Sequence, residues 1–212
     1  MESIGAGIFH LDELVGGPTL LVSADGVVLV DAGLPGVEDE LLSALESLGP
    51  SRSELHHVLI THADGDHVGS LAAIVAQTGA AVWAPPGEAD IVEGKQPTRR
   101  GDLLPGTPVE RLLSPGEIVP LHGGIEVVGT PGHTANHVSF FLPEAGVLLA
   151  GDCLNNVDGL AGSMPQFTND PEQARETVQT VAALGPRSVC FGHGPSLVGD
   201  AADQLQALAA GI

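Results

Sequence analysis

Short apolar runs separated by glycine, proline and aspartate turns recur along the chain. In the first half these runs have the length and β-branched content of strands, and they predict strands over residues 4–11, 19–23, 27–31 and 57–61. The second and third runs are separated by Ala24-Asp25-Gly26, a sequence typical of a tight turn, and therefore predict a hairpin. The N-terminal part of the chain is expected to be antiparallel sheet.

Helical spacing appears in two places among these strands. Residues 36–48 are predicted to form an amphipathic helix that ends at Gly49-Pro50, because leucines recur three and four positions apart at Leu41, Leu42, Leu45 and Leu48. Residues 68–78 are predicted to form a second helix that ends at Gly79. The segment 85–108 is rich in proline and glycine, which predicts a mobile surface segment with one short helix.

The second half repeats this succession of strands and helices. Its strands are predicted over residues 109–113, 118–119, 125–129, 138–142, 147–150 and 188–191. One helix is predicted over 171–184, with Asn169 or Asp170 as its N-cap, and a last helix over 200–210. Two series of strands, each covered by helices, predict an α/β fold in which two sheets form a sandwich with the helices outside. The length is consistent with one domain spanning residues 1–212.

The composition limits the class of partner. Seven Lys and Arg stand against 27 Asp and Glu, so the formal charge is −20 at neutral pH. Nucleic acids and anionic membranes attract clustered basic residues, so this balance argues against both. A small-molecule substrate and a monomer or homodimer are expected instead. Two cysteines, no signal-peptide pattern after Met1 and no apolar run of about 18 residues predict a cytoplasmic protein with reduced thiols.

Side chains with metal-ligand chemistry gather after the predicted strands. The loop after strand 57–61 reads Thr61-His62-Ala63-Asp64-Gly65-Asp66-His67. Three further loops repeat this placement beside glycine at a strand end, and they carry His133, Asp152 and His193. Imidazole and carboxylate groups suit zinc, iron and manganese, and strand ends can hold them rigidly. The pattern therefore predicts a metal centre rather than unrelated polar turns.

These motifs, in this order, are similar to those of the metallo-β-lactamase-fold hydrolases. The similarity covers nearly the whole chain and rests on Leu29-Val30-Asp31-Ala32-Gly33, the loop from His62 to His67, Thr130-Pro131-Gly132-His133-Thr134, Leu148-Leu149-Ala150-Gly151-Asp152 and Phe191-Gly192-His193-Gly194. The resemblance implies an αββα sandwich of two mixed sheets flanked by helices, with the site along one edge. It also implies two divalent metal ions, one held by His62, Asp64 and His133, the other by Asp66, His67 and His193, with Asp152 bridging them.

Asp64 departs from the commonest motif of the family. The usual pattern is HxHxDH, and here an aspartate replaces the second histidine to give HxDxDH. The additional hard oxygen ligand favours iron or manganese over zinc, although the donor set alone leaves all three open. The related flavodiiron oxygen reductases are similar in having a carboxylate at this place. An arrangement in which Asp64 does not coordinate and a single ion binds is the alternative.

The resemblance implies a hydrolase whose nucleophile is a hydroxide bridging the two ions, which lower the pKa of their shared water towards about 7. Asp66 would orient this hydroxide and is the predicted catalytic residue. Asp31 would accept a hydrogen bond from a ligand imidazole and fix its tautomer, with a simple turn role as the alternative. The expected substrate is a small carbonyl compound, namely an ester, thioester or lactone, with a β-lactam less favoured. A di-iron redox protein and a metal-binding sensor module are the alternatives from other classes.

Two features narrow the expected substrate further. The chain ends soon after His193, without the helical domain with which glyoxalase II binds glutathione. It also contains no Tyr, the residue that lactonases of this family place beside the metals. Both features make the substrates of glyoxalase II and of the lactonases less expected, but they do not exclude either class.

Several other reactive side chains have plainer interpretations. Lys95, Arg99 and Arg100 are conspicuous in so acidic a chain, and they are interpreted either as a solvated loop or as a lid that meets an anionic substrate. Cys153 has no basic neighbour in sequence and is expected to be a packed residue rather than a nucleophile. His137 is expected to close its loop by hydrogen bonding rather than to bind metal.

Overall fold

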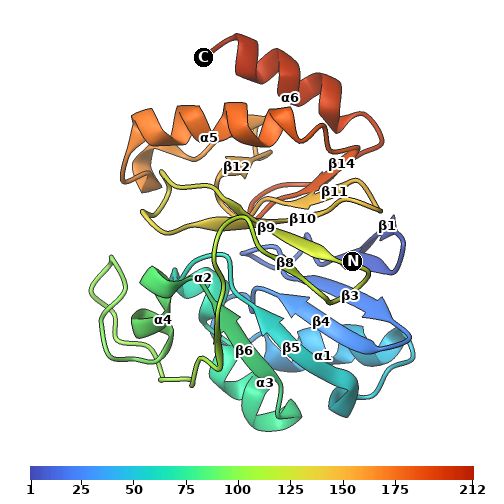
Figure 1. The fold of residues 1–212 in the computed structure, drawn as a ribbon. Helices are drawn as coiled ribbons and strands as arrows, with labels where there is room; N and C mark the ends of the chain where they lie inside the picture. Colours follow the sequence, from blue (N-terminus) through green and yellow to red (C-terminus); the bar gives the residue numbers. More distant parts are fainter.

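Two β-sheets lie face to face in the centre of the molecule, and helices cover the outer face of each (Figure 1). The computed structural model describes all residues from 1 to 212. The first sheet and its helices precede the second sheet and its helices along the chain, so each half of the sequence builds one half of the sandwich. This arrangement confirms the predicted αββα layers.

The first sheet has seven strands in the order β1-β2-β3-β4-β5-β6-β7. Their bounds are Glu2–Gly5, Ile8–His10, Thr19–Ser23, Gly26–Val30, Leu55–Leu59, Ala81–Ala84 and Arg111–Leu112. The first four strands are antiparallel and include the predicted hairpin, whereas β4, β5, β6 and β7 are parallel to one another. The sheet is therefore mixed. Hairpins can join its antiparallel strands, whereas its parallel strands need longer connections than a hairpin provides.

Two predicted strands of this region were wrong in detail. The run at 4–11 is the hairpin β1–β2 rather than one strand, because Ala6 and Gly7 have left-handed φ angles of 52° and 75° and reverse the chain. The run at 109–113 shortens to β7 and pairs with β6, so it belongs to the first sheet and not to the second series of strands. A short apolar run fits either sheet, and the pairing is settled only by tertiary contacts.

The second sheet has six strands in the order β15-β14-β11-β10-β9-β8. In chain order their bounds are Ile118–Val119, Ile125–Gly129, Val138–Leu142, Val147–Leu149, Ser188–Cys190 and Leu197–Val198. β14 is parallel to β11, and the other pairs are antiparallel. A separate two-stranded sheet pairs β12, Leu154–Asn155, with β13, Ala161–Gly162. Strands of two residues are too short to show an alternating pattern, which is why β12, β13 and β15 escaped the sequence prediction.

The helices follow the predictions closely except in one place. They are α1 Glu38–Ser47, α2 Gly65–Val68, α3 Leu71–Thr78, α4 Pro86–Val92, α5 Pro171–Ala183 and α6 Ala201–Ala210, with 3₁₀ turns at Arg52–Glu54 and Pro165–Phe167. The predicted helix 68–78 is instead divided into α2 and α3, because Gly69 donates its N–H to the carbonyl of Gly33 at 2.9 Å. The predicted cap of α5 is present, since Asp170 accepts the backbone N–H groups of Glu172 and Gln173.

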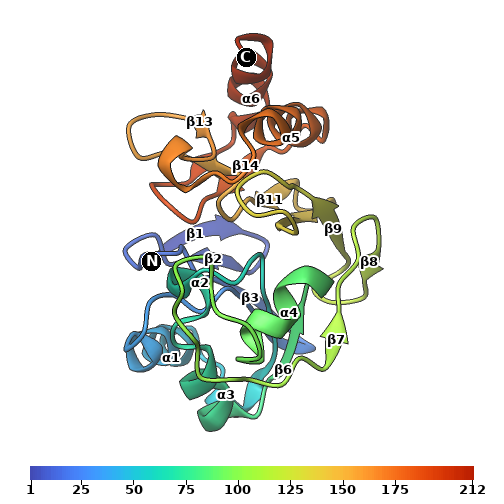
Figure 2. The same ribbon diagram turned by 90° about the vertical axis from the view of Figure 1, so that its left-hand side faces the viewer.

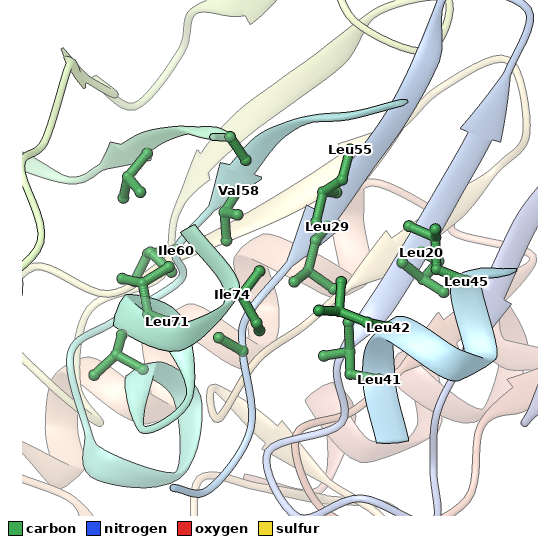
Figure 3. Close-up of a cluster of buried hydrophobic side chains, with 14 of the residues drawn as sticks. Leu20, Leu29, Leu41, Leu42, Leu45, Leu55, Val58, Ile60, Leu71 and Ile74 are labelled. Carbon is green, nitrogen blue, oxygen red and sulfur yellow. The ribbon is translucent and has the colours of Figure 1, made fainter. Parts of the chain in front are cut away.

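Three apolar clusters hold the layers together. In the first, Leu29 and Leu55 of the sheet face Leu41 and Leu42 of α1, and Ile74 of α3 lies beside them (Figure 3). The second cluster fills the space between the two sheets, and the third joins the second sheet to α5 and α6. Each fully buried Leu of this kind contributes about 1.5–3 kcal/mol. The strand ends that carry the polar loops are therefore fixed by packing on both sides.

The loops that follow β5, β9, β11 and β14 converge at one edge of the sandwich, where α2 and α4 also lie (Figure 1 and Figure 2). These are the four loops in which the sequence places its candidate metal ligands. The structure contains no helix with the length and hydropathy needed to cross a membrane.

Candidate metal centre

The loop after β5 places four of the candidate ligands at the start of a helix. The backbone is still extended at Asp64, which is the N-cap position, and α2 begins at Gly65, so Asp66 and His67 lie in its only turn. His62 and His67 are completely buried. The four candidate ligands of this loop are thereby held within six positions, on the short connection between β5 and α2 and on the first turn of that helix.

The other three candidate ligands come from the second sheet. His133 lies in the loop between β9 and β10, Asp152 comes shortly after β11, and His193 comes shortly after β14. Gly192 shows why glycine stands beside His193. A Cβ atom added there would lie 2.2 Å from Oδ1 of Asp152 and 2.8 Å from Cε1 of His67, closer than atoms can approach. The backbone of this loop therefore passes directly against the cluster.

The structure brings all seven predicted ligands together in three overlapping groups. Within each group the donor atoms lie within 4.8 Å of one another, and the groups are His62, Asp64 and His133, then His62, His67 and Asp152, then Asp66, His67 and His193. We call His62, Asp64 and His133 the first half-site and Asp66, His67 and His193 the second half-site. Asp152 lies between them, 3.5 Å from Nε2 of His133 and 3.2 Å from Nε2 of His193.

The imidazoles of the cluster are oriented by bonds to their Nδ1 atoms. Nδ1 of His62 lies 3.0 Å from the Thr61 hydroxyl, and Nδ1 of His133 lies 3.0 Å from the hydroxyl of Ser163. His67 donates from Nδ1 to Oδ2 of Asp31 at 2.7 Å. In all three residues Nε2 is thereby left to face the cluster, which is the arrangement of a histidine held ready to bind a metal.

Three atoms that face the cluster have no hydrogen-bond partner although they are buried. They are Nε2 of His62, Nε2 of His67 and Oδ1 of Asp152. A buried polar atom without a partner costs about 1–3 kcal/mol, so such atoms are uncommon unless they serve another purpose. Imidazole nitrogen and carboxylate oxygen are ligands of zinc, iron and manganese. The donor set therefore fits one or more divalent cations.

Asp31 forms the hydrogen bond that the sequence led us to expect of it. Besides His67, it accepts the backbone N–H of Thr61 at 2.9 Å and the Thr61 hydroxyl at 2.7 Å. Its backbone has a left-handed φ of 58°, which is unusual for a residue other than glycine but tolerated best by Asp and Asn. Since the Thr61 hydroxyl donates to Asp31, it accepts from His62, so one carboxylate orients both imidazoles.

Charge in the second half-site is balanced by protonated imidazoles. Hydrogen bonds to Asp152 and Asp66 raise the pKa of His193 to about 9. Burial opposes ionisation of Asp66, but the bond from His193 and the charge of His67 outweigh it and lower the pKa of Asp66 to about 2. Burial likewise lowers the pKa of His67, yet the charges of Asp152 and Asp31 raise it well above its usual value. A divalent cation bound by these atoms would replace the protons.

In the first half-site an arginine supplies the positive charge. Arg99, from the segment between α4 and β7, contacts both carboxylate oxygens of Asp64 and Nε2 of His133. Burial disfavours the ionised Asp64, but its close contacts with His133, His62 and Arg99 hold its pKa far below the ordinary range. Burial lowers the pKa of His133. Of the two interpretations of Arg99, the solvated loop is therefore wrong, because the guanidinium reaches into the cluster.

Two residues that support the cluster were not singled out from the sequence. Glu88 of α4 is buried and accepts the N–H of Ala63 at 3.1 Å and the hydroxyl of Thr134 at 2.7 Å, so it ties together the loops of the first half-site. His10 of β2 lies 3.0 Å from the carbonyl of Phe191 and 2.7 Å from the hydroxyl of Ser196, on either side of His193. A buried carboxylate and imidazole give no signal in sequence, because their partners are distant along the chain.

His137 and the cysteines have the plainer roles expected of them. His137 accepts the backbone N–H of Asp152 at 3.1 Å and bonds Thr130 at 2.7 Å, so it closes its loop by hydrogen bonding. Both thiols are buried, and burial raises the pKa of Cys153 and of Cys190 to about 12. A thiol with such a pKa is not a nucleophile at neutral pH.

A cavity of about 430 Å³ opens beside Asp64 and Asp66. Its walls combine apolar side chains from two loops of the first sheet and from the segment after α4 with the polar residues Thr98, Arg100 and Asp102; the apolar residues are Val15, Leu34, Pro35 and Leu104. This volume is in the range of cavities that bind small molecules.

Comparisons with known proteins show which family and fold the chain shares. The model of the metallo-β-lactamase superfamily matches residues 14–193. The chain is 33% identical over 201 residues to the uncharacterized protein YobT of Bacillus subtilis (strain 168), which covers 84% of this chain and 82% of that protein. It is 34% identical over 175 residues to a hydroxyacylglutathione hydrolase of Rhodobacter capsulatus, which covers 81% of this chain and 58% of that enzyme. The chain thus spans little more than half of the latter.

Solved structures show the same fold. A metallo-β-lactamase family protein from Thermus thermophilus superimposes with a TM-score of 0.74 at 24% identity, covering 99% of this chain and 80% of the other. A metallo-β-lactamase of Cronobacter sakazakii with an HARLDQ motif has a TM-score of 0.76 at 22% identity, covering 91% and 77%. At these identities the similarity establishes the architecture alone.

Proposed function

Because the chain belongs to the metallo-β-lactamase superfamily and is a metal-dependent hydrolase, we propose that its histidine and aspartate cluster holds two divalent ions and hydrolyses a small carbonyl substrate. The observation that carries this proposal is the overlap of the three ligand groups. Each group has its donor atoms within 4.8 Å, and the middle group shares His62 with one neighbour and His67 with the other. This spacing suits two ions side by side better than one.

In this assignment the first half-site holds one ion, the second half-site holds the other, and Asp152 bridges them. Zinc, iron and manganese all fit the donors, and the carboxylate of Asp64 favours the two harder metals. When bound, the ions supply Lewis acidity to the substrate carbonyl and make a shared water acidic enough to attack near neutral pH.

The residues around the proposed ions would hold the reacting groups in position. Asp66 would orient the attacking water, and because its pKa is about 2 it stays ionised and accepts a hydrogen bond rather than a proton. Asp31 and Thr61 would keep the imidazoles of His62 and His67 aimed at the ions. Burial of these groups limits access of bulk water to the cluster.

The cavity beside Asp64 and Asp66 supports a small acyl compound as the substrate. Its apolar walls suit an acyl chain, and Arg100 at its rim suits a negatively charged end of the molecule. The similarity to a hydroxyacylglutathione hydrolase favours a thioester or ester over a β-lactam. We therefore place thioesters and esters first, lactones next and β-lactams last.

Metal analysis combined with a substrate screen tests this proposal. The purified chain is analysed for zinc, iron and manganese and assayed with p-nitrophenyl esters, thioesters, lactones and nitrocefin. At least one acyl substrate should be turned over, and His133→Ala and Asp152→Ala should each reduce turnover on the order of 10³-fold, since loss of a metal ligand removes several kcal/mol of transition-state stabilisation.

Matched variants control for general damage. His56 and Asp158 are exposed and lie outside the cluster, so His56→Ala and Asp158→Ala should keep full turnover. Activity that survives both His133→Ala and Asp152→Ala would remove the metal mechanism. Bound iron with a redox-dependent absorbance and no acyl turnover would instead support the di-iron redox alternative, which the carboxylate of Asp64 favours.

A further inference from the structure

Arg99 occupies an unusual position for a basic residue of an acidic protein. It lies between α4 and β7, directly after the buried Thr98 and directly before the exposed residues 100–103, and its own side chain is only 21% exposed. The guanidinium points into the first half-site, which otherwise contains two imidazoles and one carboxylate.

The contacts of Arg99 are with the same atoms that would bind an ion. Its Nε lies 2.8 Å from both Oδ1 and Oδ2 of Asp64, and its Nη2 contacts Oδ2 as well. Nη2 also lies 2.8 Å from Nε2 of His133. Metal–ligand distances in such sites are about 2.0–2.2 Å, so a guanidinium nitrogen at these positions excludes a cation from the same donors.

The backbone on the far side of the guanidinium holds it in place. Nη1 of Arg99 donates to the carbonyl of His133 at 3.3 Å and also to the carbonyl of Phe167. The next residue, Arg100, places its guanidinium 5.0 Å from the centre of the Phe167 ring. The segment after α4 is thereby joined across the site to the 3₁₀ turn Pro165–Phe167.

The second half-site has no such competitor. The positively charged partners of Asp66 in the structure are imidazoles of the cluster itself, and no contact of Arg99 extends to Asp66, His67 or His193. A cation therefore meets no guanidinium at the donor atoms of the second half-site, whereas in the first half-site Arg99 already contacts Asp64 and His133.

Withdrawal of Arg99 does not require the sheet to open. Residues 98–102 close on themselves, since Thr98 donates to the carbonyl of Asp102 and Gly101 donates to the carbonyl of Thr98, each at 2.8 Å. Gly101 has a left-handed φ of 90°, which suits this tight turn. These two backbone bonds tie the turn to itself and not to either sheet, so the side chain of Arg99 can leave Asp64 without breaking a bond between strands.

We propose that Arg99 competes with one of the two metal ions, so that the half-sites load unequally. The second half-site takes the first ion, and the first half-site takes the second ion only when Arg99 and the turn 98–102 withdraw from Asp64. This inference rests on the proposed function, because it requires that the cluster bind metal.

Metal titration tests the competition without any activity measurement. Chelator-treated wild type, Arg99→Met and Arg100→Met are titrated calorimetrically with zinc chloride and, in parallel, with manganese chloride. Wild type should bind one ion tightly and a second at least about tenfold more weakly, whereas Arg99→Met should bind the second ion about tenfold more tightly than wild type does. Arg100→Met removes the same charge from the loop but leaves the contact of Arg99 with Asp64 intact, so its affinity for the second ion should stay closer to wild type than that of Arg99→Met.

Trypsin digestion of the unmodified chain gives an independent readout. Saturation with the second ion should free the side chain of Arg99 and speed cleavage of the bond after Arg99 several-fold, while one ion equivalent should not. Two sites of equal affinity in wild type would overturn the proposed competition. A second ion that binds more weakly to Arg99→Met than to wild type would also overturn it, because that result means that Arg99 supports Asp64 as a ligand. Absence of metal binding in every variant would instead overturn the proposed function itself.

Discussion

The two half-sites are built from the same residue types but are held together in different ways. In the second half-site the carboxylate of Asp66 is balanced by His193, and Asp31 fixes His67 from within the core. In the first half-site the carboxylate of Asp64 is balanced by Arg99, which arrives from an exposed segment 35 positions away. The carboxylate of one half-site is balanced by an imidazole that follows a strand of the sandwich, and that of the other by a side chain from a surface segment.

This difference indicates which half-site keeps its arrangement when the surface loops move. The partners of the second half-site lie on β2 or directly after β4, β11 and β14, and they move only if the sandwich moves. The partner of the first half-site lies on a turn that is exposed after it, from residue 100 to residue 103. We therefore expect substitution of residues that support the second half-site to weaken binding of the first ion. Substitution of residues that support the first half-site should affect binding of the second ion and the stability of the fold.

Asp31→Asn is the sharpest test of the second half-site. Asn tolerates the left-handed backbone at this position but removes the negative charge that orients His67. Affinity for the first ion should fall by about 10- to 100-fold, as is usual when the partner of a metal-binding histidine is lost. Competition with a chelator of known affinity measures this change.

The exposed turn residue Asp25 offers a matched control, since Asp25→Asn makes the same chemical change far from His67. Its metal affinity should equal that of wild type. If Asp31→Asn kept full affinity for the first ion, the assignment of that ion to the second half-site would be wrong.

Glu88→Gln tests the support of the first half-site. One amide oxygen can still accept a hydrogen bond, but the amide nitrogen that replaces the other oxygen is a donor and cannot accept from Ala63 or Thr134. The free energy of unfolding should fall by about 1–3 kcal/mol, measured by chemical denaturation of the metal-free chain.

The comparison between half-sites sharpens this prediction. Glu88→Gln should weaken binding of the second ion and leave the first unchanged, since Ala63 and Thr134 adjoin His62, Asp64 and His133. Glu176→Gln, at an exposed position of α5, makes the same substitution without these partners and should leave stability unchanged. Equal loss of both ions in Glu88→Gln would contradict the separate support of the two half-sites.

His10 gives the smallest effect, and it appears as a dependence of stability on pH. Burial lowers the pKa of His10 below its usual value of 6.5, so the unfolded chain binds a proton that the folded chain resists. Stability contributed by neutral His10 is present above pH 6.5 and is lost as the pH falls below it. Relative to wild type, His10→Asn should lose less stability as the pH falls from about 7.5 to about 5, since it has no imidazole to protonate on unfolding.

His56→Asn is the control for this measurement, because His56 is exposed. Its unfolding free energy should follow the wild-type pH dependence. A pH dependence in His10→Asn that is identical to wild type would show that burial does not lower the pKa of His10.

Much of the architecture could be predicted from the chain because the signals are local. The apolar runs of β3, β4, β9 and β10 and the spaced leucines of α1 report burial of each element on its own. The sheet to which β7 belongs and the division of α2 from α3 were missed. Each depends on a partner that lies elsewhere in the chain, β6 in one case and Gly33 in the other.

The candidate ligands were recognisable for a related reason. Each stands at the end of an apolar strand beside glycine, so the pattern that predicts the strand also marks the residue that follows it. Glu88 and His10 carry no such mark, since their neighbours in sequence say nothing about Thr134 or Phe191.

The sequence by itself determined the layers of the fold, the residue types of the centre and the carboxylate that distinguishes its motif. Only the tertiary structure decided that this carboxylate is paired with Arg99 and that the two half-sites differ in their support. The physical reason is that hydrophobic periodicity records how each segment is buried, whereas the partner of a buried charge is whichever group the packed layers bring within a few ångströms of it.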